Sequence, residues 1–302
     1  MQQKYYSNGK LLLTGEYGIL DGAKGLAVPT KFGQTLEITS IKETVILWKG
    51  ITVDDRIWFS AEFNLQDLTI KKSSDSEIAK TLQQIFIEAK KLNPKFLNDA
   101  TGFNGVTKLS FPREWGLGTS STLINNIATW AGIDAHQLLW KSFGGSGYDI
   151  SCAQHNTPII YHIKNNLPQV KPVDFNPLFK DAIFFVYLNQ KQSSKKAISN
   201  YRSKKFNLKR LISDIDTISL KMVSAKELLE FEILVTAHEK LLSEILEITP
   251  VKEKLFVDYF GTIKSLGGWG GDFIMVTGNE KTPEYFKSKG FEIVLSFKEM
   301  VL

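Results

Sequence analysis

The sequence has few of the residues that build disulfide frameworks or zinc sites. Its 302 residues include one cysteine, Cys152, and four histidines, and the spacings CxxC and HExxH are absent. One cysteine cannot form a disulfide within the chain, and a zinc site is not expected. The same scarcity agrees with a reducing compartment, so we expect a cytoplasmic protein.

Long apolar runs are missing as well. No run approaches the ~18 residues that a membrane span needs. The first residues, MQQKYYSNGKLLLTGEY, contain no extended apolar segment of the kind found in signal peptides. The net charge of +5, from 37 basic and 32 acidic residues, is too small to indicate nucleic-acid binding. We therefore expect neither a membrane nor a nucleic acid as a partner.

A hydrophobic content of 43% supports a folded core, and the length suggests one large or two ordinary domains. Residues 9–71 contain several strand-like segments. A helix is predicted over 75–92, with Ser74 and Glu77 as its capping box, and a strand over 106–111. Further helices are predicted over 119–131 and from Asp134, and a strand over 159–163.

Prolines and asparagines gather over residues 164–180, which suggests a domain boundary there. We therefore assign residues 1–170 to a first domain and 171–302 to a second. For the second domain the pattern predicts a strand, several helices, then strand, helix and strand, over residues 182–188, 193–266, 273–277, 283–288 and 291–297.

The most distinctive stretch is WGLGTSSTLINN, residues 115–126. Gly116 and Gly118 precede a predicted helix that begins Thr119-Ser120-Ser121. Helix starts expose backbone N–H groups and partial positive charge, and glycines let phosphate oxygens approach them. The hydroxyls can cap the helix, bind phosphate or ligate Mg²⁺. Neither GxxxxGK[ST] nor GxGxxG is matched, and a capped glycine turn without a ligand explains this stretch alone equally well.

Three other stretches change this balance. SNGKLLLTGEY (7–17), GGSGYD (144–149) and LGGWGGDF (266–273), taken with the first loop, resemble the GHMP kinases in order and spacing. This superfamily includes galactokinase, homoserine kinase, mevalonate kinase and phosphomevalonate kinase. Its motifs read approximately PGKxxLxGEY/H, PxxxGLGSSA and GAGGG, and the resemblance covers nearly the whole chain.

The resemblance implies an α+β fold, a GHMP kinase fold. Its N-terminal domain is similar to domain 2 of ribosomal protein S5, and its C-terminal domain is ferredoxin-like. It also implies ATP and Mg²⁺ as cofactors and a small-molecule substrate. A homodimer is left open.

Roles for individual residues follow from the resemblance. Asp149 matches the carboxylate near the substrate hydroxyl, and Lys10 matches the lysine near the transferred phosphoryl group. A carboxylate can take the acceptor's proton, and a nearby lysine keeps it ionised. Cofactor-binding residues would be Gly116, Leu117, Gly118, Thr119, Ser120 and Ser121, with Thr119 and Ser120 as metal ligands. Substrate-binding residues would be Glu16, Ser146, Gly147, Lys195, Gly268 and Gly270.

From the residues alone, simpler interpretations stay open. Lys10 can be a solvated lysine at a strand end, Asp149 can cap the helix that follows it, and Glu16 can bond the backbone of its own turn. Likewise, His136 and Cys152 are readily explained as packing residues.

Several details favour the phosphomevalonate kinase-like branch. SNGKLLLTGEYGIL, GSGYDISCAQ and the final GGD are similar to that branch, and GYDI is similar to a divergent bacterial group. Residues 189–210 contain eight basic residues and no acidic one, which suits an anionic substrate. We therefore expect a kinase that phosphorylates phosphomevalonate.

Other details depart from the family pattern. Asn8 stands in place of a proline and Trp269 in place of an alanine, and residues 134–147 lack the glutamate by which mevalonate kinase binds metal. A mevalonate kinase or a sugar kinase is the alternative within the superfamily. A non-catalytic protein that binds a nucleotide or a partner is the alternative of another class.

Overall fold

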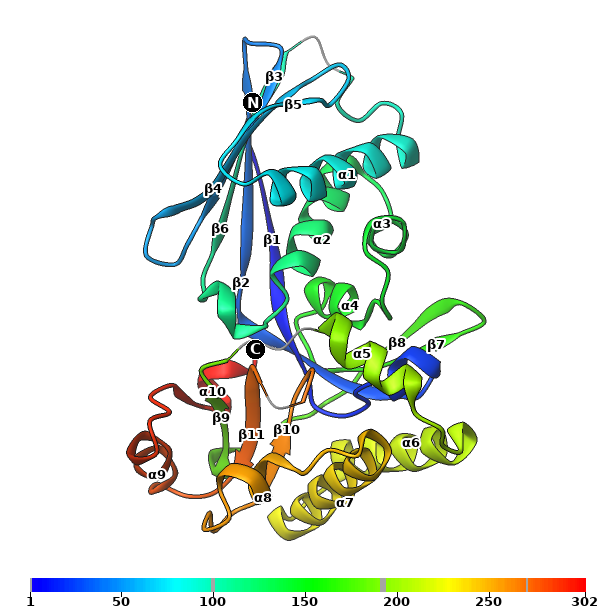
Figure 1. Cartoon of the computed structure of the whole chain (residues 1–302), viewed down its shortest axis with the longest axis vertical. Helices are drawn as coiled ribbons and strands as arrows, with labels where there is room; N and C mark the ends of the chain where they lie inside the picture. Colours follow the sequence, from blue (N-terminus) through cyan, green and yellow to red (C-terminus); the bar gives the residue numbers. More distant parts are fainter. Residues whose placement is uncertain (1, 99–100, 191–193, 270) are drawn as a thin grey trace. The chain divides into compact units, whose positions relative to one another are not determined.

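The computed structural model describes residues 2–98, 101–190, 194–269 and 271–302 (Figure 1). The chain forms two compact units. Unit 1 consists of Met1–Gly9, Phe32–Arg113 and Leu117–Gln154, and unit 2 of Lys10–Lys31, Glu114–Gly116 and His155–Leu302. Each unit combines segments that are distant in the sequence. The domain boundary at residue 170 therefore stays a prediction from composition.

The sheet of unit 1 has the strand order β5-β4-β3-β6-β2. Only the pair β3 and β6 is parallel, and the other neighbours along this path are antiparallel. The strand β1 pairs with β2 off this path. The bounds are β1 Gln2–Leu12, β2 Gly25–Ile41, β3 Val45–Ile51, β4 Ile57–Asn64, β5 Ile70–Ser73 and β6 Gly102–Leu109.

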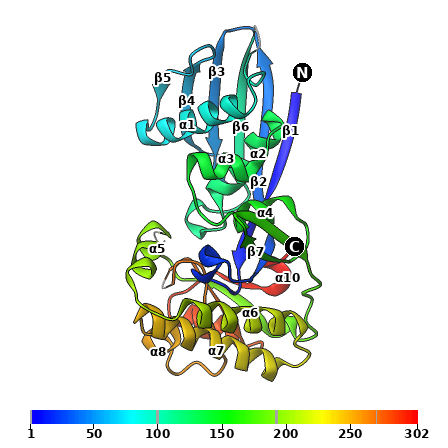
Figure 2. The ribbon, with the colours of Figure 1, turned by 90° about the vertical axis from the view of Figure 1, so that its right-hand side faces the viewer.

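Four helices of unit 1 lie on one face of this sheet (Figures 1 and 2). They are α1 (Ser76–Leu92), α2 (Thr119–Ala131), α3 (Ala135–Ser142) and α4 (Tyr148–Gln154). The apolar residues of α1 recur at helical spacing, so one face of the helix is buried against the sheet. Phe86 of α1 meets the rings of Trp48 and Phe63 edge to face, at centroid distances of 5.4 and 5.6 Å.

The helix predicted over 75–92 is confirmed, but its predicted cap is wrong. The N-cap residue is Asp75, whose carboxylate accepts hydrogen bonds from the backbone N–H groups of Glu77 and Ile78. The Ser74 hydroxyl instead bonds the backbone of Ser60. Asp134 caps α3 as expected, by accepting from Gln137 N.

Unit 2 contains a four-stranded antiparallel sheet of order β10-β11-β9-β12. In chain order this is 4-1-3-2 read from β12, and helices connect β9 to β10 and β11 to β12. This arrangement is the ferredoxin-like one, so the expected fold of the C-terminal part is confirmed. The bounds are β9 Ile183–Tyr187, β10 Ile263–Ser265, β11 Phe273–Thr277 and β12 Val294–Ser296, with α9 Thr282–Ser288 and α10 Phe297–Met300.

The described part of the connection from β9 to β10 contains four helices, and two of them, α6 and α7, lie side by side (Figure 2). They are α5 (Ser194–Ser203), α6 (Leu208–Ser224), α7 (Leu228–Leu246) and α8 (Val251–Leu255). Short 3-10 turns lie at η1 (Gly18–Asp21), η2 (Arg113–Trp115) and η3 (Lys180–Ala182).

Unit 2 also includes the first part of β2, which pairs with β7 (Ile159–Lys164). The next strand, β8 (Leu167–Pro172), pairs with β7. It lies in the proline-containing stretch where composition suggested a boundary, at the edge of the sheet, where prolines are tolerated. Within the part of the chain that the structure describes, no helix is long and apolar enough to span a membrane.

Candidate active site

Parts of three of the four glycine-containing stretches meet at Gly116 in unit 2. The ammonium of Lys10, at the end of β1, donates a hydrogen bond of 2.8 Å to the Gly116 carbonyl. The Asp272 carboxyl group, just before β11, approaches from another side. A Cβ added to Gly116 would lie 2.6 Å from Asp272 Cγ, and Gly116 has a φ of +67°. Glycine is therefore required here both by close approach and by backbone conformation.

The helix after this glycine begins without a side-chain cap. Gly118 is the N-cap of α2, with a φ of +96° and no side-chain hydrogen bond to the first turn. The Ser121 and Thr122 hydroxyls donate to the Gly118 carbonyl, so they support the turn. Ser120 is exposed and Thr119 half-buried. The first turn of α2 thus has the features of an anion site with two accessible hydroxyls.

The segment with Asp149 lies in unit 1, packed on the same helix. Asp149 is half-buried in the first turn of α4, where its carboxylate accepts from Ile150 N at 3.2 Å. Ser146 and Gly147 precede it and are buried, and Gly147 has a φ of +85°. Gln154 of α4 donates to the Asn125 side chain of α2 at 3.0 Å. Unit 1 therefore joins the hydroxyl loop and the Asp149 segment through one pair of helices.

The third motif, residues 266–273, turns through Gly267, which has a φ of +61°. Trp269, at 3% exposed, packs in one hydrophobic cluster with Tyr17 of the first motif (residues 7–17) and with Tyr201 of α5. Its ring therefore supports the turn of the first motif. Gly270 lies outside the described residues, and so does the Lys195 side chain. For Gly268 the role in substrate binding stays a prediction.

Behind the first motif lies a cluster of four buried ionisable side chains, which we call the buried charge cluster: Glu16, His238, Glu239 and Lys264. The Lys264 ammonium lies 2.8 Å from Glu16 Oε1 and 3.5 Å from Glu239 Oε1. The Gly15 N–H donates to His238 Nε2 at 3.0 Å, so this nitrogen carries no proton. Glu16 is 1% exposed and Lys264 is fully buried. Glu16 therefore contacts side chains of α7 and β10 within unit 2.

Burial dominates the ionisation of this cluster. It raises the pKa of Glu239 to about 7 and also raises the pKa of Glu16, although the Lys264 charge opposes both shifts. Burial and the Lys264 charge hold the pKa of His238 well below its usual value. His238 is thus a neutral acceptor, and its 3.4 Å contact with Glu16 Oε2 is not an ion pair. One lysine faces two carboxyl groups, which favours one extra proton in the cluster.

Sequence reasoning missed His238, Glu239, Lys264 and the position of Asp272. A signal for two of them was available. Along α7 the buried apolar residues are Phe231, Val235, Leu242 and Leu246, and His238 and Glu239 fall on that same face. Ionisable residues on the buried face of a helix mark a polar network or a site. Lys264 has no comparable local signal, because β10 contains only three residues.

The chain resembles known kinases in sequence and in fold. No protein-family model matches the chain. A mevalonate kinase from Methanocaldococcus jannaschii is 24% identical, with 95% of this chain and 96% of the relative covered. A crystal structure of the Methanococcus jannaschii mevalonate kinase matches with a TM-score of 0.72 and 19% identity, over 97% of this chain and 96% of the other.

Two further crystal structures extend the likeness. Streptococcus pneumoniae phosphomevalonate kinase, in complex with phosphomevalonate and AMPPNP, matches with a TM-score of 0.70 and 14% identity over 97% of this chain and 99% of the other. Lactococcus lactis galactokinase with galactose matches with a TM-score of 0.66 and 13% identity over 95% and 88%. The chain has the GHMP kinase fold.

The resemblance to the GHMP kinases inferred from the motifs is confirmed, as is the mixed α+β class. The full-length sequence match together with the shared fold supports a kinase enzyme. The matched kinases differ in substrate, since their names include mevalonate kinase, phosphomevalonate kinase and galactokinase. The residues assigned to the site from the GHMP motifs stay predictions, and they belong to the proposal below.

Replacing Gly116 by alanine tests the meeting of the motifs. The added Cβ clashes with the Asp272 carboxyl group and also adopts an unfavourable φ. Gly132→Ala is the matched control, because Gly132 has a φ of +64° and no heavy atom within 4 Å of an added Cβ. We expect Gly132→Ala to lower the free energy of unfolding by about 1 kcal/mol without changing ATP affinity. Gly116→Ala should cost more and weaken ATP binding at least about tenfold. ATP affinity is measured by calorimetry and stability by denaturation. If Gly116→Ala and Gly132→Ala had equal effects in both, the close approach of Asp272 to Gly116 would be contradicted.

The Glu239→Gln variant tests the extra proton. Between about pH 4.5 and 7 the folded chain holds a proton on Glu239 that the unfolded chain releases. The wild type therefore loses stability as the pH rises through this window. Glutamine can still accept the Ser265 hydrogen bond and cannot ionise. We expect the variant to gain roughly 2 kcal/mol relative to wild type between pH 5 and pH 8.

Urea unfolding across this pH range measures the difference between the two proteins. His238 is present in both and its contribution cancels. Glu244→Gln is the control on the same helix, because Glu244 is exposed. A stability difference for Glu239→Gln that does not vary with pH would show that no proton is held there.

Proposed function

We propose that this chain is an ATP-dependent kinase that transfers the γ-phosphoryl group to phosphomevalonate. The observation that most supports it is the arrangement at Gly116. The Lys10 ammonium binds the Gly116 carbonyl, and Asp272 lies close to the same glycine. This turn precedes the first turn of the 13-residue helix α2, which has no side-chain cap. Exposed N–H groups and the helix dipole suit the phosphates of a nucleotide, and a lysine bound to the glycine turn would offset their charge.

The glycine loop, Lys10 and Asp149 each have a separate task in the transfer. The backbone of Gly116 to Ser121 holds the nucleotide phosphates, and Lys10 lies at the start of that loop. Asp149 accepts the proton of the acceptor, which strengthens its oxygen as a nucleophile. Such transfer needs positioning and neutralised charge more than covalent catalysis.

A magnesium ion would fit the same loop. The Thr119 and Ser120 hydroxyls are hard oxygen donors at the helix start. Thr119 is half-buried and Ser120 is exposed. Bound there, the ion would supply charge neutralisation to the phosphates of ATP. Among the described residues no group of three or more histidine, cysteine or acidic side chains forms a metal site. The phosphates would therefore provide much of the ion's coordination.

Two observations bear on the identity of the acceptor, and they favour different molecules. The eight basic residues of 189–210 favour an acceptor that already carries a phosphate group. The 24% identity to a mevalonate kinase over nearly the full chain favours mevalonate instead. We retain phosphomevalonate as the first candidate and mevalonate as the second. The superfamily also includes sugar kinases, as the galactokinase match illustrates.

A side-by-side assay separates these candidates. The protein is incubated with ATP and Mg²⁺ and either mevalonate or phosphomevalonate, and ³¹P NMR follows ADP and product. A diphosphate formed from phosphomevalonate alone supports the proposal, and phosphorylation of mevalonate alone transfers it to the second candidate. ATP binding without turnover of any acceptor tested, sugars included, would favour a non-catalytic nucleotide-binding protein.

Asp149→Asn tests the proposed base. Asparagine keeps the size of the side chain and its hydrogen bond to Ile150 N but cannot take a proton. We expect kcat to fall by roughly 10²- to 10⁴-fold with ATP affinity unchanged. Asp134→Asn is the control, since asparagine caps helices as well as aspartate does. Unchanged kcat in Asp149→Asn would remove this residue from the role of base.

A further inference from the structure

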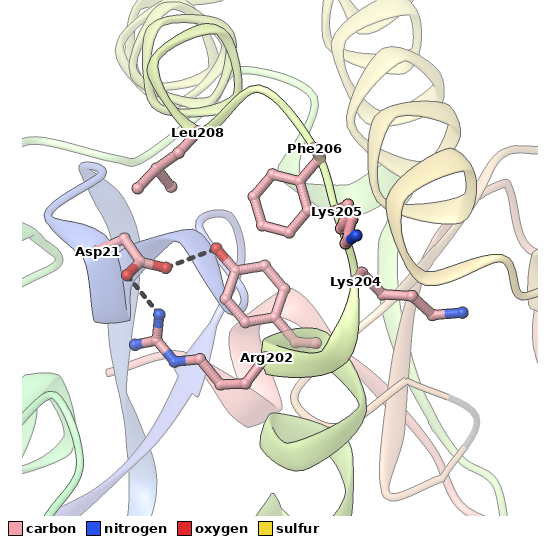
Figure 3. Close-up of a pocket in the computed structure, with 7 residues that line it drawn as sticks. Asp21, Arg202, Lys204, Lys205, Phe206 and Leu208 are labelled. Carbon is pink, nitrogen blue, oxygen red and sulfur yellow. Dashed lines mark hydrogen bonds and ion pairs between the residues drawn. The ribbon is translucent and has the colours of Figure 1, made fainter.

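A pocket of about 300 Å³ opens in unit 2 beside the turn of the first motif (Figure 3). It is lined by Asp21 of η1, by the last turn of α5, by the link from α5 to α6 and by the first residue of α6. The lining residues are Asp21, Tyr201, Arg202, Lys204, Lys205, Phe206 and Leu208. We call it the α5–α6 pocket.

The charged side chains of the α5–α6 pocket are mostly positive. Arg202 pairs with Asp21, which also accepts a hydrogen bond of 2.6 Å from the Tyr201 hydroxyl (Figure 3). Lys204 pairs with Glu247, a side chain 73% exposed outside the pocket. Lys205 is exposed and makes no hydrogen bond or ion pair with any described residue. Of the three cations, Arg202 is thus paired inside the pocket, Lys204 points away to Glu247, and Lys205 has no partner among the described residues.

The helix α6, which begins beside the pocket, has an unfavourable charge distribution in its first turn. Acidic residues are favoured in the first turn of a helix, where the dipole is positive, and basic residues are disfavoured. The first turn of α6 contains Lys209 and Arg210 and no acidic residue. Arg210 pairs with Asp214 of the next turn at 3.5 Å, so Lys209 is the first-turn cation that opposes the helix dipole in the free protein. Local conflicts of this kind are expected near binding sites.

The other lining side chains are apolar or aromatic. Tyr201, Phe206 and Leu208 form this part, and the rings of Tyr201 and Phe206 lie 5.2 Å apart. A ligand that fits both parts has an anionic head and a short apolar body. Arginine and lysine side chains bind phosphate through charge-assisted hydrogen bonds, which are stronger than those between neutral groups.

We propose that the α5–α6 pocket binds the phosphate group of a small phosphorylated organic molecule, with Arg202 and Lys205 as its main ligands. The ligand competes with Asp21 for Arg202. The site deepens the proposed kinase function if this phosphate belongs to the acceptor, and it is a second ligand site if the phosphate belongs to another molecule.

Binding here reaches the first motif through aromatic contacts. Tyr201 bonds Asp21 on one side and stacks on Tyr17 on the other, with ring centroids 5.3 Å apart and planes at 24°. Tyr17 directly follows Glu16 of the buried charge cluster. When Asp21 is released from Arg202, its hydrogen bond with Tyr201 is also free to change. Tyr201 stacks on Tyr17, the neighbour of Glu16 in the sequence. A ligand in this pocket can change how the first motif is held.

Calorimetry with two probes tests the site without needing turnover. Inorganic phosphate and butyl phosphate are titrated into the full chain with AMPPNP present, so that the phosphate loop is already filled. We expect butyl phosphate to bind more tightly than inorganic phosphate, because its chain contacts the apolar wall. Lys205→Ala and Arg202→Gln should each weaken butyl phosphate binding about tenfold.

Lys209→Ala is the matched control, since it removes one charge from the same segment and Lys209 does not line the pocket. It should leave binding within about twofold of wild type. Absence of butyl phosphate binding to the wild type at millimolar concentration would overturn the proposal. Equal weakening in Lys209→Ala and Lys205→Ala would also overturn it, because a general positive field would then explain the binding.

A kinetic comparison identifies the source of the phosphate. If it is the acceptor's own, Lys205→Ala raises the KM for phosphomevalonate about tenfold and leaves kcat nearly unchanged. If it belongs to another molecule, the KM is unchanged, and butyl phosphate alters the rate of the wild type but not of Lys205→Ala. Failure of the kinase proposal itself would appear as no turnover with the calorimetric results intact.

Discussion

The buried ion pair between Glu16 and Lys264 is the interaction on which the rest of unit 2 depends. It joins the first glycine-containing motif, at the end of β1, to β10, which leads into the third motif. Two fully desolvated charges at 2.8 Å are expensive to bury and are retained only when each satisfies the other. The pair therefore fixes where two segments that are distant in the sequence lie. The contacts of Gly116 with Lys10 and Asp272 hold the first and third motifs together at a second point.

The same pair explains the unusual ionisation around it. Lys264 also faces Glu239, and the neutral His238 accepts from the Gly15 backbone, so the turn of the first motif is held by one charge and one hydrogen bond. On its outer side the turn is held by Tyr17, which packs with Tyr201 and Trp269. The α5–α6 pocket lies at the end of this aromatic contact. The first motif is therefore held from the core by electrostatics and from the surface by packing.

Much of the fold could be predicted from the sequence, because its helices have clear apolar periodicity and capping residues. Helices α1 and α2 and strand β11 were predicted within one residue, since their patterns are local. The role of Trp269 and the buried charge cluster could not be predicted. Their meaning depends on contacts between residues more than 200 positions apart, such as Glu16 with Lys264. Asp75 was missed as a cap because Ser74 offers equally good chemistry one residue earlier.

A double-mutant cycle on Glu16 and Lys264 tests the central claim most directly. The free energy of unfolding is measured by denaturant for wild type, Glu16→Gln, Lys264→Met and the double variant. Lys264→Met leaves the Glu16 and Glu239 carboxyl groups without a cation, whereas Glu16→Gln leaves Lys264 with Glu239 at 3.5 Å. We therefore expect the larger loss, about 3–5 kcal/mol, for Lys264→Met. The double variant should recover part of that loss, with a coupling energy of about 2 kcal/mol or more. Additive losses, with no coupling between the two residues, would contradict the account.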